Sequence, residues 1–159
     1  MRKLWNRPDD AVWSLSTLSP DGVPNMNICT YVTAVSLDPK LMLVAVYRET
    51  QTLKNVAVGE TVLLQLLGED LAPVVRICGQ LSGTKIDKIS RLKKRFELGE
   101  EGRLSYFQAA AGIMTLNVEQ LIETSGDHYL LVGRVTKAKN LHDKPILTTT
   151  YLKANGYIR

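Results

Sequence analysis

The sequence has few of the residue types from which metal and nucleophile sites are built. It contains two cysteines, Cys29 and Cys78, and two histidines, and the cysteines lie far apart without C-x-x-C spacing. A zinc site needs several such ligands at short, regular spacings, so none is expected here. Both cysteines stand among apolar residues, where a reduced thiol behaves as a small core or wall side chain.

Long apolar runs are also missing. The longest, residues 41–47, falls far short of the roughly 18–20 residues that a membrane-spanning helix needs. Residues 1–8 are basic but lack the apolar stretch of a signal peptide. We therefore expect a cytoplasmic protein without a membrane-spanning segment.

Several motifs of nucleotide-binding and hydrolytic proteins do not occur. The sequence contains neither a G-x-x-x-x-G-K-[ST] loop nor a G-x-G-x-x-G turn, which argues against a P-loop and a dinucleotide fold. No serine stands in a nucleophile elbow, and no Ser/His/Asp set can be assigned. Regular alternation of strands and helices is missing too, which disfavours a doubly wound sheet.

The composition that remains is that of one globular domain, residues 1–159, with 45% hydrophobic and 23% charged residues. The net charge is +4. Much of the positive charge lies in one segment, at Lys85, Lys88, Arg91, Lys93, Lys94 and Arg95. We interpret this segment as the solvated face of a helix, with attraction of anionic nucleotides as the alternative. A nucleic-acid-binding module is least favoured, because no aromatic residues are interleaved with these charges.

Apolar alternation and continuous apolar runs predict a mostly β (α+β) domain, an antiparallel β-barrel with peripheral helices. The clearest helix is expected over 84–96, where Ile86, Ile89, Leu92 and Phe96 form one apolar stripe. Shorter helices are expected after residue 50, from Pro73, and over 104–111, and 98–102 reads as a polar break. The expected strands are 11–18, 25–33, 41–47, 61–67, 113–116, 118–124, 129–137 and 146–151.

Residues 25–55 organise these elements. Two extended runs flank a turn at 36–39, and hydroxyl and amide side chains follow at a possible helix start over 49–55. Backbone amides and Thr30 in the segment 28–32 can hydrogen-bond a planar heterocycle, although an ordinary strand fits as well. Free amides at the helix start can bind a phosphate, although a plain helix cap also fits. The order suggests a slot with apolar walls and a polar phosphate end.

His128 is the other candidate. It lies in the turn 125–128 between two expected strands, beside Asp127. The side chain is either simply exposed in this turn, or it faces a cleft and contacts a bound ring or phosphate.

Three stretches together resemble the flavin reductase-like family with the FMN-binding split-barrel fold. Gly126-Asp127-His128 is followed after six residues by Val135, as in the family signature. Residues 35–44 are similar to the family's V-S-L-x-P-x-L strand entry, and 50–55 follows at the expected place. Residues 82–88 match an S-G-x-x-x-D-K run of related members, and the resemblance covers about residues 11–146.

The resemblance implies a homodimer that binds FMN or FAD and is reduced by NADH or NADPH. His128 would orient the nicotinamide while hydride passes directly from its C4 to flavin N5. The phosphate end would be surrounded by Glu49, Thr50, Gln51, Thr52 and Leu53, and Ser82 and Gly83 would form another flavin contact. The isoalloxazine and ribityl region would be lined by Ile28, Cys29, Thr30, Tyr31, Val32, Ala34 and Val35.

The leading hypothesis is therefore an NAD(P)H-dependent flavin reductase. The alternative is a flavoredoxin-like FMN-binding electron-transfer protein that is reduced by a redox protein partner and has no NAD(P)H site of its own. Residues 145–151 motivate it, because three threonines stand near the place where many reductases of the family have a glycine. FMN is preferred over FAD, since the short chain suggests no second pocket for an adenine.

Overall fold

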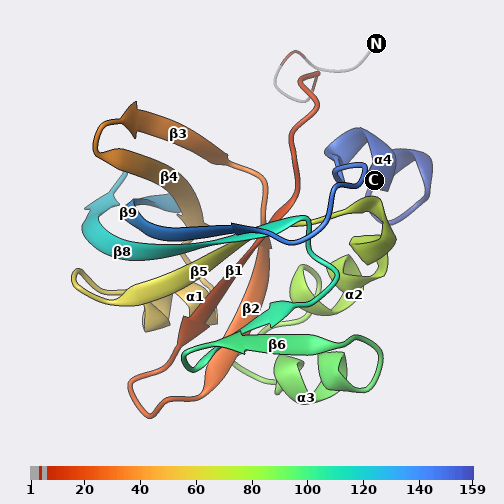
Figure 1. Ribbon diagram of the computed structural model, residues 1–159, viewed down its shortest axis with the longest axis horizontal. Helices are drawn as coiled ribbons and strands as arrows, with labels where there is room; N and C mark the ends of the chain where they lie inside the picture. Colours follow the sequence, from red (N-terminus) through yellow and green to blue (C-terminus); the bar gives the residue numbers. More distant parts are fainter. Residues whose placement is uncertain (1–3, 5–6) are drawn as a thin grey trace.

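The structure is a computed structural model that describes residue 4 and residues 7–159. Its main element is a seven-stranded antiparallel sheet of order β2-β1-β5-β8-β9-β4-β3 (Figure 1). This confirms the predicted mostly β, antiparallel architecture. The strands are β1 (Trp13–Leu18), β2 (Pro24–Cys29), β3 (Val32–Leu37), β4 (Lys40–Tyr47), β5 (Thr61–Leu66), β8 (Gly112–Glu123) and β9 (His128–Asn140).

The sheet curls but does not close into a continuous barrel. Its two edges are β2 and β3, and within residues 7–159 no strand ladder joins them. The chain crosses from one edge to the other through Thr30 and Tyr31 alone. The Tyr31 carbonyl accepts a hydrogen bond from the Ala45 amide of β4 at 2.9 Å, so the crossing is fixed where the sheet is open.

The two faces of the curled sheet bury different cores, because successive strand side chains point to opposite faces. The inner core contains Leu15, Val44 and Leu131, from three different strands. The outer core contains Val12, Met26 and residues of the helices. Figure 1 shows α2, α3 and α4 gathered on one side of the molecule, away from β3 and β4.

The helices are short, and none in the described part of the chain is long and apolar enough to cross a membrane. They are α1 (Gln51–Asn55), the 3₁₀ helix η2 (Glu69–Val74), α2 (Val75–Cys78), α3 (Lys88–Lys93) and α4 (Thr149–Ala154). The helix predicted over 84–96 was too long: α3 begins after Asp87, whose carboxylate accepts from the Ser90 amide at 3.0 Å. Pro73 lies inside η2 and does not start a helix.

Three further predictions were wrong, all in short segments. Residues 98–102 and 104–111 form a hairpin, β6 (Leu98–Glu101) and β7 (Leu104–Phe107), in place of a break and a helix. Ile146 makes only an isolated bridge, and Thr148 then caps α4, so no strand covers 146–151. Segments of four to six residues carry too few apolar positions for strand and helix periods to be distinguished.

The hairpin is attached to the sheet through the fully buried Gln65 of β5. Its side-chain oxygen accepts from the Phe107 amide at 2.9 Å, and its nitrogen contacts Met26 Sδ at 3.2 Å. We predict that Gln65→Leu lowers the free energy of unfolding by about 1–3 kcal/mol, because the buried Phe107 N–H loses its acceptor.

Chemical denaturation of both proteins measures this. The matched control is Gln108→Leu at the exposed residue directly after β7, expected to change stability by less than about 0.5 kcal/mol. Equal effects of the two substitutions would show that the Gln65–Phe107 hydrogen bond does not carry the difference.

Candidate functional site

A cleft of about 480 Å³ opens where the sheet is split. Its walls come from β2, the Thr30–Tyr31 crossing, the end of β4, the start of α1 and the segment between α2 and α3. His128, the first residue of β9, stands at one end of the cleft and Lys88, the first residue of α3, also lines it. Segments distant in sequence therefore meet in one cavity.

The structure places most of the candidate residues in this cleft. They are Ile28, Cys29, Thr30, Tyr31, Glu49, Thr50, Gln51, Thr52, Ser82, Gly83 and His128. Four others lie outside it. Val32 packs toward the inner core, Ala34 and Val35 are exposed on the edge strand β3, and Leu53 packs on the inner core from α1. Val32, Ala34 and Val35 lie outside the cleft because β3 leads away from it after the crossing and pairs only with β4.

The cleft also contains residues that sequence reasoning missed, namely Asn25, Asn27, Ala45, Tyr47, Cys78, Gly79, Gln80, Leu81 and Lys88. The alternation of β2 was a usable signal for two of them, since Asn25 and Asn27 share a face with Cys29. Lys88 was placed on a solvated helix face, although it ends the S-G-x-x-x-D-K run of residues 82–88.

One end of the cleft is aromatic. The His128 ring meets the rings of Tyr31 and Tyr47 edge-on, with centroids 5.5 and 5.4 Å apart. His128 Nδ1 lies 2.6 Å from the Asp127 carboxylate. Because a carboxylate can only accept, Nδ1 is the donor and Nε2 is left for a ligand. This hydrogen bond holds the pKa of Asp127 below its ordinary value.

Arg48 fixes the turn that carries His128. Its guanidinium donates to the carbonyls of Thr124 and Gly126 at 2.8 and 3.3 Å and to Glu123 at 2.7 Å. Its backbone amide donates to the Asp127 carbonyl at 2.9 Å. The hydrogen bond from Arg48 holds the pKa of the Glu123 carboxyl below its usual range. These hydrogen bonds fix the turn and therefore the position of His128.

Farther along the cleft, a buried ammonium group is short of partners. Lys88 is only 5% exposed, and its Nζ donates to the Cys78 carbonyl at 2.8 Å. An ammonium has further N–H donors, and among the described residues no carboxylate lies within ion-pair distance of it. Burial lowers the pKa of Lys88, the expected result for a charge taken out of water without a counter-ion. An anionic ligand group would supply that counter-ion.

The hydroxyl and amide side chains near α1 are mostly engaged with each other. Thr50 Oγ1 accepts from the Leu53 amide at 3.2 Å, and Thr52 Oγ1 accepts from Asn25 Nδ2 at 3.2 Å. Gln51 Nε2 donates to Asn55 at 2.7 Å. Within the described residues, the backbone N–H groups of Gln51 and Thr52 have no protein partner, as expected for the first turn of a helix. A helix of only five residues contributes little dipole charge of its own. Lys88 is therefore the main positive charge near the start of α1.

The side-chain oxygen of Asn27 is another polar group that a ligand could pair with. Asn27 is buried, lines the cleft between Asn25 and Cys29, and its Oδ1 has no hydrogen-bond partner among the described residues. A ligand with an N–H or O–H donor would satisfy it. The thiols on the walls are inert by contrast, since burial raises the pKa of both Cys29 and Cys78 to about 12 and keeps them protonated.

Two smaller hollows adjoin the cleft at opposite ends. The first, of about 350 Å³, shares Tyr31, Ala45 and His128 with the cleft and extends to Leu130. The second, of about 380 Å³, shares Asn25, Gln51, Gly83 and Lys88 with it. The three cavities thus form a row that runs from the histidine turn past Lys88.

A curled, split antiparallel sheet with a cleft lined by an aromatic cluster and a buried cation defines a split-barrel protein. The chain belongs to the flavin reductase like domain family, whose model matches residues 9–155. A search of curated protein sequences finds no match.

Solved structures of low sequence identity share this fold. An NADH:FAD oxidoreductase of Streptomyces globisporus is 18% identical with a TM-score of 0.79, covering 92% of this chain and 84% of that one. An FMN-binding protein of Thermus thermophilus is 18% identical with a TM-score of 0.73, covering 88% and 75%. An oxidoreductase of Sinorhizobium meliloti is 20% identical with a TM-score of 0.78, covering 91% of this chain, which spans about half (48%) of that protein.

The unpaired ammonium leads to a prediction about Lys88. Lys88→Met removes a buried charge without a counter-ion, so we expect the ligand-free protein to keep its stability or gain about 1 kcal/mol. We also expect phosphate ions to raise the melting temperature of the parent protein and not that of the variant, since the anion binds the folded state through this ammonium.

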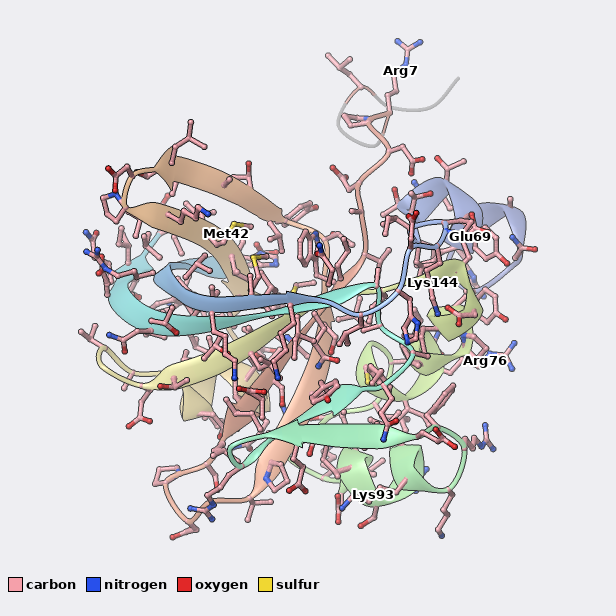
Figure 2. The ribbon with its side chains drawn as sticks, in the orientation of Figure 1. Arg7, Met42, Glu69, Arg76, Lys93 and Lys144 are labelled. Atoms are coloured by element: carbon pink, nitrogen blue, oxygen red, sulfur yellow. The ribbon has the colours of Figure 1, made fainter. Side chains whose placement is uncertain are left out.

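Thermal unfolding with and without inorganic phosphate measures both effects. The matched control is Lys93→Met, because Lys93 lies at the exposed end of α3 with its side chain directed outward (Figure 2). A large loss of stability in ligand-free Lys88→Met would instead mean that the bond to Cys78 is structural.

Proposed function

We propose that the chain is a flavoprotein whose cleft holds a flavin mononucleotide unit, as FMN or as that half of FAD, and that it acts as an NAD(P)H-dependent flavin reductase. The observation that carries the proposal is the buried Lys88 ammonium, which lies in the same cleft as the His128 aromatic cluster. A flavin nucleotide has a matching order of groups, with a planar ring at one end and a phosphate at the other. Family membership supports the same assignment.

The chain's residues would then divide the binding between them. Lys88 and the free amides of Gln51 and Thr52 would hold the phosphate. Asn27 Oδ1 would accept a hydrogen bond from a flavin hydroxyl or N–H group. The protonated thiols of Cys29 and Cys78 would serve as apolar walls, because a thiol with a pKa of about 12 does not attack a bound ring. A bound flavin supplies the two-electron chemistry, and the protein supplies position and charge.

The hollow beside His128 would receive the nicotinamide of NADH or NADPH. It opens onto the aromatic end of the cleft, so the reductant and the flavin ring would lie next to each other. The Asp127 hydrogen bond and the Arg48 brace would keep His128 in one orientation, leaving Nε2 to bind the reductant. The name of the Streptomyces globisporus oxidoreductase, which includes NADH, supports this assignment.

The alternative function is an FMN-binding electron carrier that a redox protein reduces. The exposure of Tyr31 and Tyr47 at the aromatic end favours it, since both rings present apolar surface that a partner protein could cover. The similar structure from Thermus thermophilus is that of an FMN-binding protein, which supports this alternative.

The two functions predict different results for His128→Ala. If His128 orients the nicotinamide, the variant should lose reductase activity by about tenfold to a hundredfold, while flavin affinity changes by less than about twofold. NADH or NADPH oxidation in the presence of FMN or FAD, followed by near-ultraviolet absorbance, measures the first quantity. Flavin fluorescence quenching measures the second.

His142→Ala is the matched control, because His142 is exposed and bonds the Gln108 carbonyl away from the cleft. Equal losses of activity and flavin binding in His128→Ala would make His128 a structural or flavin-site residue. Tight flavin binding with no oxidation of either nicotinamide nucleotide would favour the electron carrier.

We also propose that the protein is a homodimer in which a second copy covers β3. Leu37 at the end of this edge strand is 87% exposed and Val35 is 48% exposed, an apolar strip that water contacts in the single chain.

We predict that Leu37→Glu shifts a dimer toward monomer, because it places a charge in the covered strip. Light scattering coupled to size exclusion measures this, with Val58→Glu as the control at an exposed valine outside β3. A parent protein that is monomeric at micromolar concentration would contradict the dimer.

A further inference from the structure

We infer that the hollow beyond Lys88 is a binding site for the adenosine 5′-phosphate half of FAD, so that FAD is the preferred flavin. This inference rests on the proposed flavin site and extends it past the phosphate. It replaces the preference for FMN, whose only basis was the apparent lack of a second pocket. We call this cavity the distal hollow. Its walls include Val23, Pro24, Thr84, Lys85, Ile86 and Lys88.

The position of the distal hollow fits the connectivity of FAD. The hollow and the cleft share Asn25, Gln51, Gly83 and Lys88, so a group bound at Lys88 borders both cavities. FAD continues from the flavin phosphate through a second phosphate to ribose and adenine. A phosphate at Lys88 therefore leaves the rest of the dinucleotide at the entrance of a hollow of about 380 Å³. The opposite end of the cleft, at His128, stays free for the reductant.

Close packing of backbone against side chain forms the passage between the two cavities. A Cβ atom on Gly83 would collide with the Asn25 side chain and crowd Gln51. Glycine thus lets the segment after α2 approach β2 closely while Lys88, five residues later, reaches both cavities.

The charge of the hollow suits a second phosphate. Lys85 is exposed on its wall, and no carboxylate among the described residues lies within ion-pair distance of Lys85. One carboxylate, Asp87, also lines the hollow, but it is occupied by the amide and hydroxyl of Ser90 at 3.0 and 2.5 Å. Lys85 and Lys88 together provide two cations where a pyrophosphate would lie.

The apolar part of the hollow suits a purine ring. Val23 is 59% exposed. Pro24 and the half-buried Ile86 line the same cavity. Apolar side chains beside cations are the usual lining of a nucleotide pocket, where the flat base covers the apolar surface. FMN would leave this surface in water.

Equilibrium binding of FAD, FMN and adenosine 5′-monophosphate to the purified protein tests the inference. We expect FAD to bind about tenfold more tightly than FMN. We also expect adenosine 5′-monophosphate to displace FAD and to leave FMN in place, since it competes only for the distal hollow.

Two substitutions and their controls locate the effect. Lys85→Glu and Val23→Asp should weaken FAD binding by about threefold to tenfold and change FMN binding by less than about twofold. Lys94→Glu at the exposed C-cap of α3 and Val58→Asp at an exposed valine make the same chemical changes outside the distal hollow, and should affect neither flavin. Two independent wall positions keep the test decisive if one variant does not fold.

Equal affinities for FAD and FMN, with both wall variants unchanged, would overturn the inference and leave the flavin reductase proposal intact. Displacement of FMN by adenosine 5′-monophosphate would also overturn it, because the nucleotide would then occupy the cleft itself. Failure of the protein to bind either flavin would overturn the proposed function along with it.

Discussion

The site exists because the curled sheet stops short of closure. The main-chain bond between Ala45 and Tyr31 holds the crossing segment on β4, so the chain passes between the two edge strands without bringing them into a ladder. A closed barrel of this size would fill its interior with side chains. The open seam instead leaves room for a ligand between β2, β4 and the helical side of the molecule. Most of the candidate side chains border this seam or one of its extensions.

The cleft combines two requirements that are separately unfavourable. A buried lysine costs stability without a counter-ion, and a buried amide oxygen such as that of Asn27 costs stability without a donor. One ligand that carries an anionic group and a neighbouring hydrogen-bond donor satisfies both. The ligand-free fold therefore holds these groups in place before binding, which lowers the entropy lost when the ligand arrives.

The sequence predicted the sheet and much of the cleft, for identifiable reasons. Alternating and continuous apolar runs marked the long strands, and the Gly126-Asp127-His128 turn together with residues 50–55 pointed to two ends of one site. Lys88 was not predicted as a site residue because the apolar stripe of 84–96 placed it on a polar face, although it ends the S-G-x-x-x-D-K run of residues 82–88. The observed helix starts at Lys88 itself, which turns that side chain inward. The distal hollow was not predicted because its walls come from two loops and from β2, α1 and α3, which only the folded topology brings together.

The braced histidine turn has a consequence for timing. His128 is paired across the ladder with Tyr47, and Arg48, the next residue, holds the same turn. The group that would meet the reductant and one ring of the aromatic cluster thus belong to one hydrogen-bonded unit. Motions of such a unit are small and fast compared with loop closure. In the proposed reductase, the reactants would therefore meet a site that is already assembled when they enter.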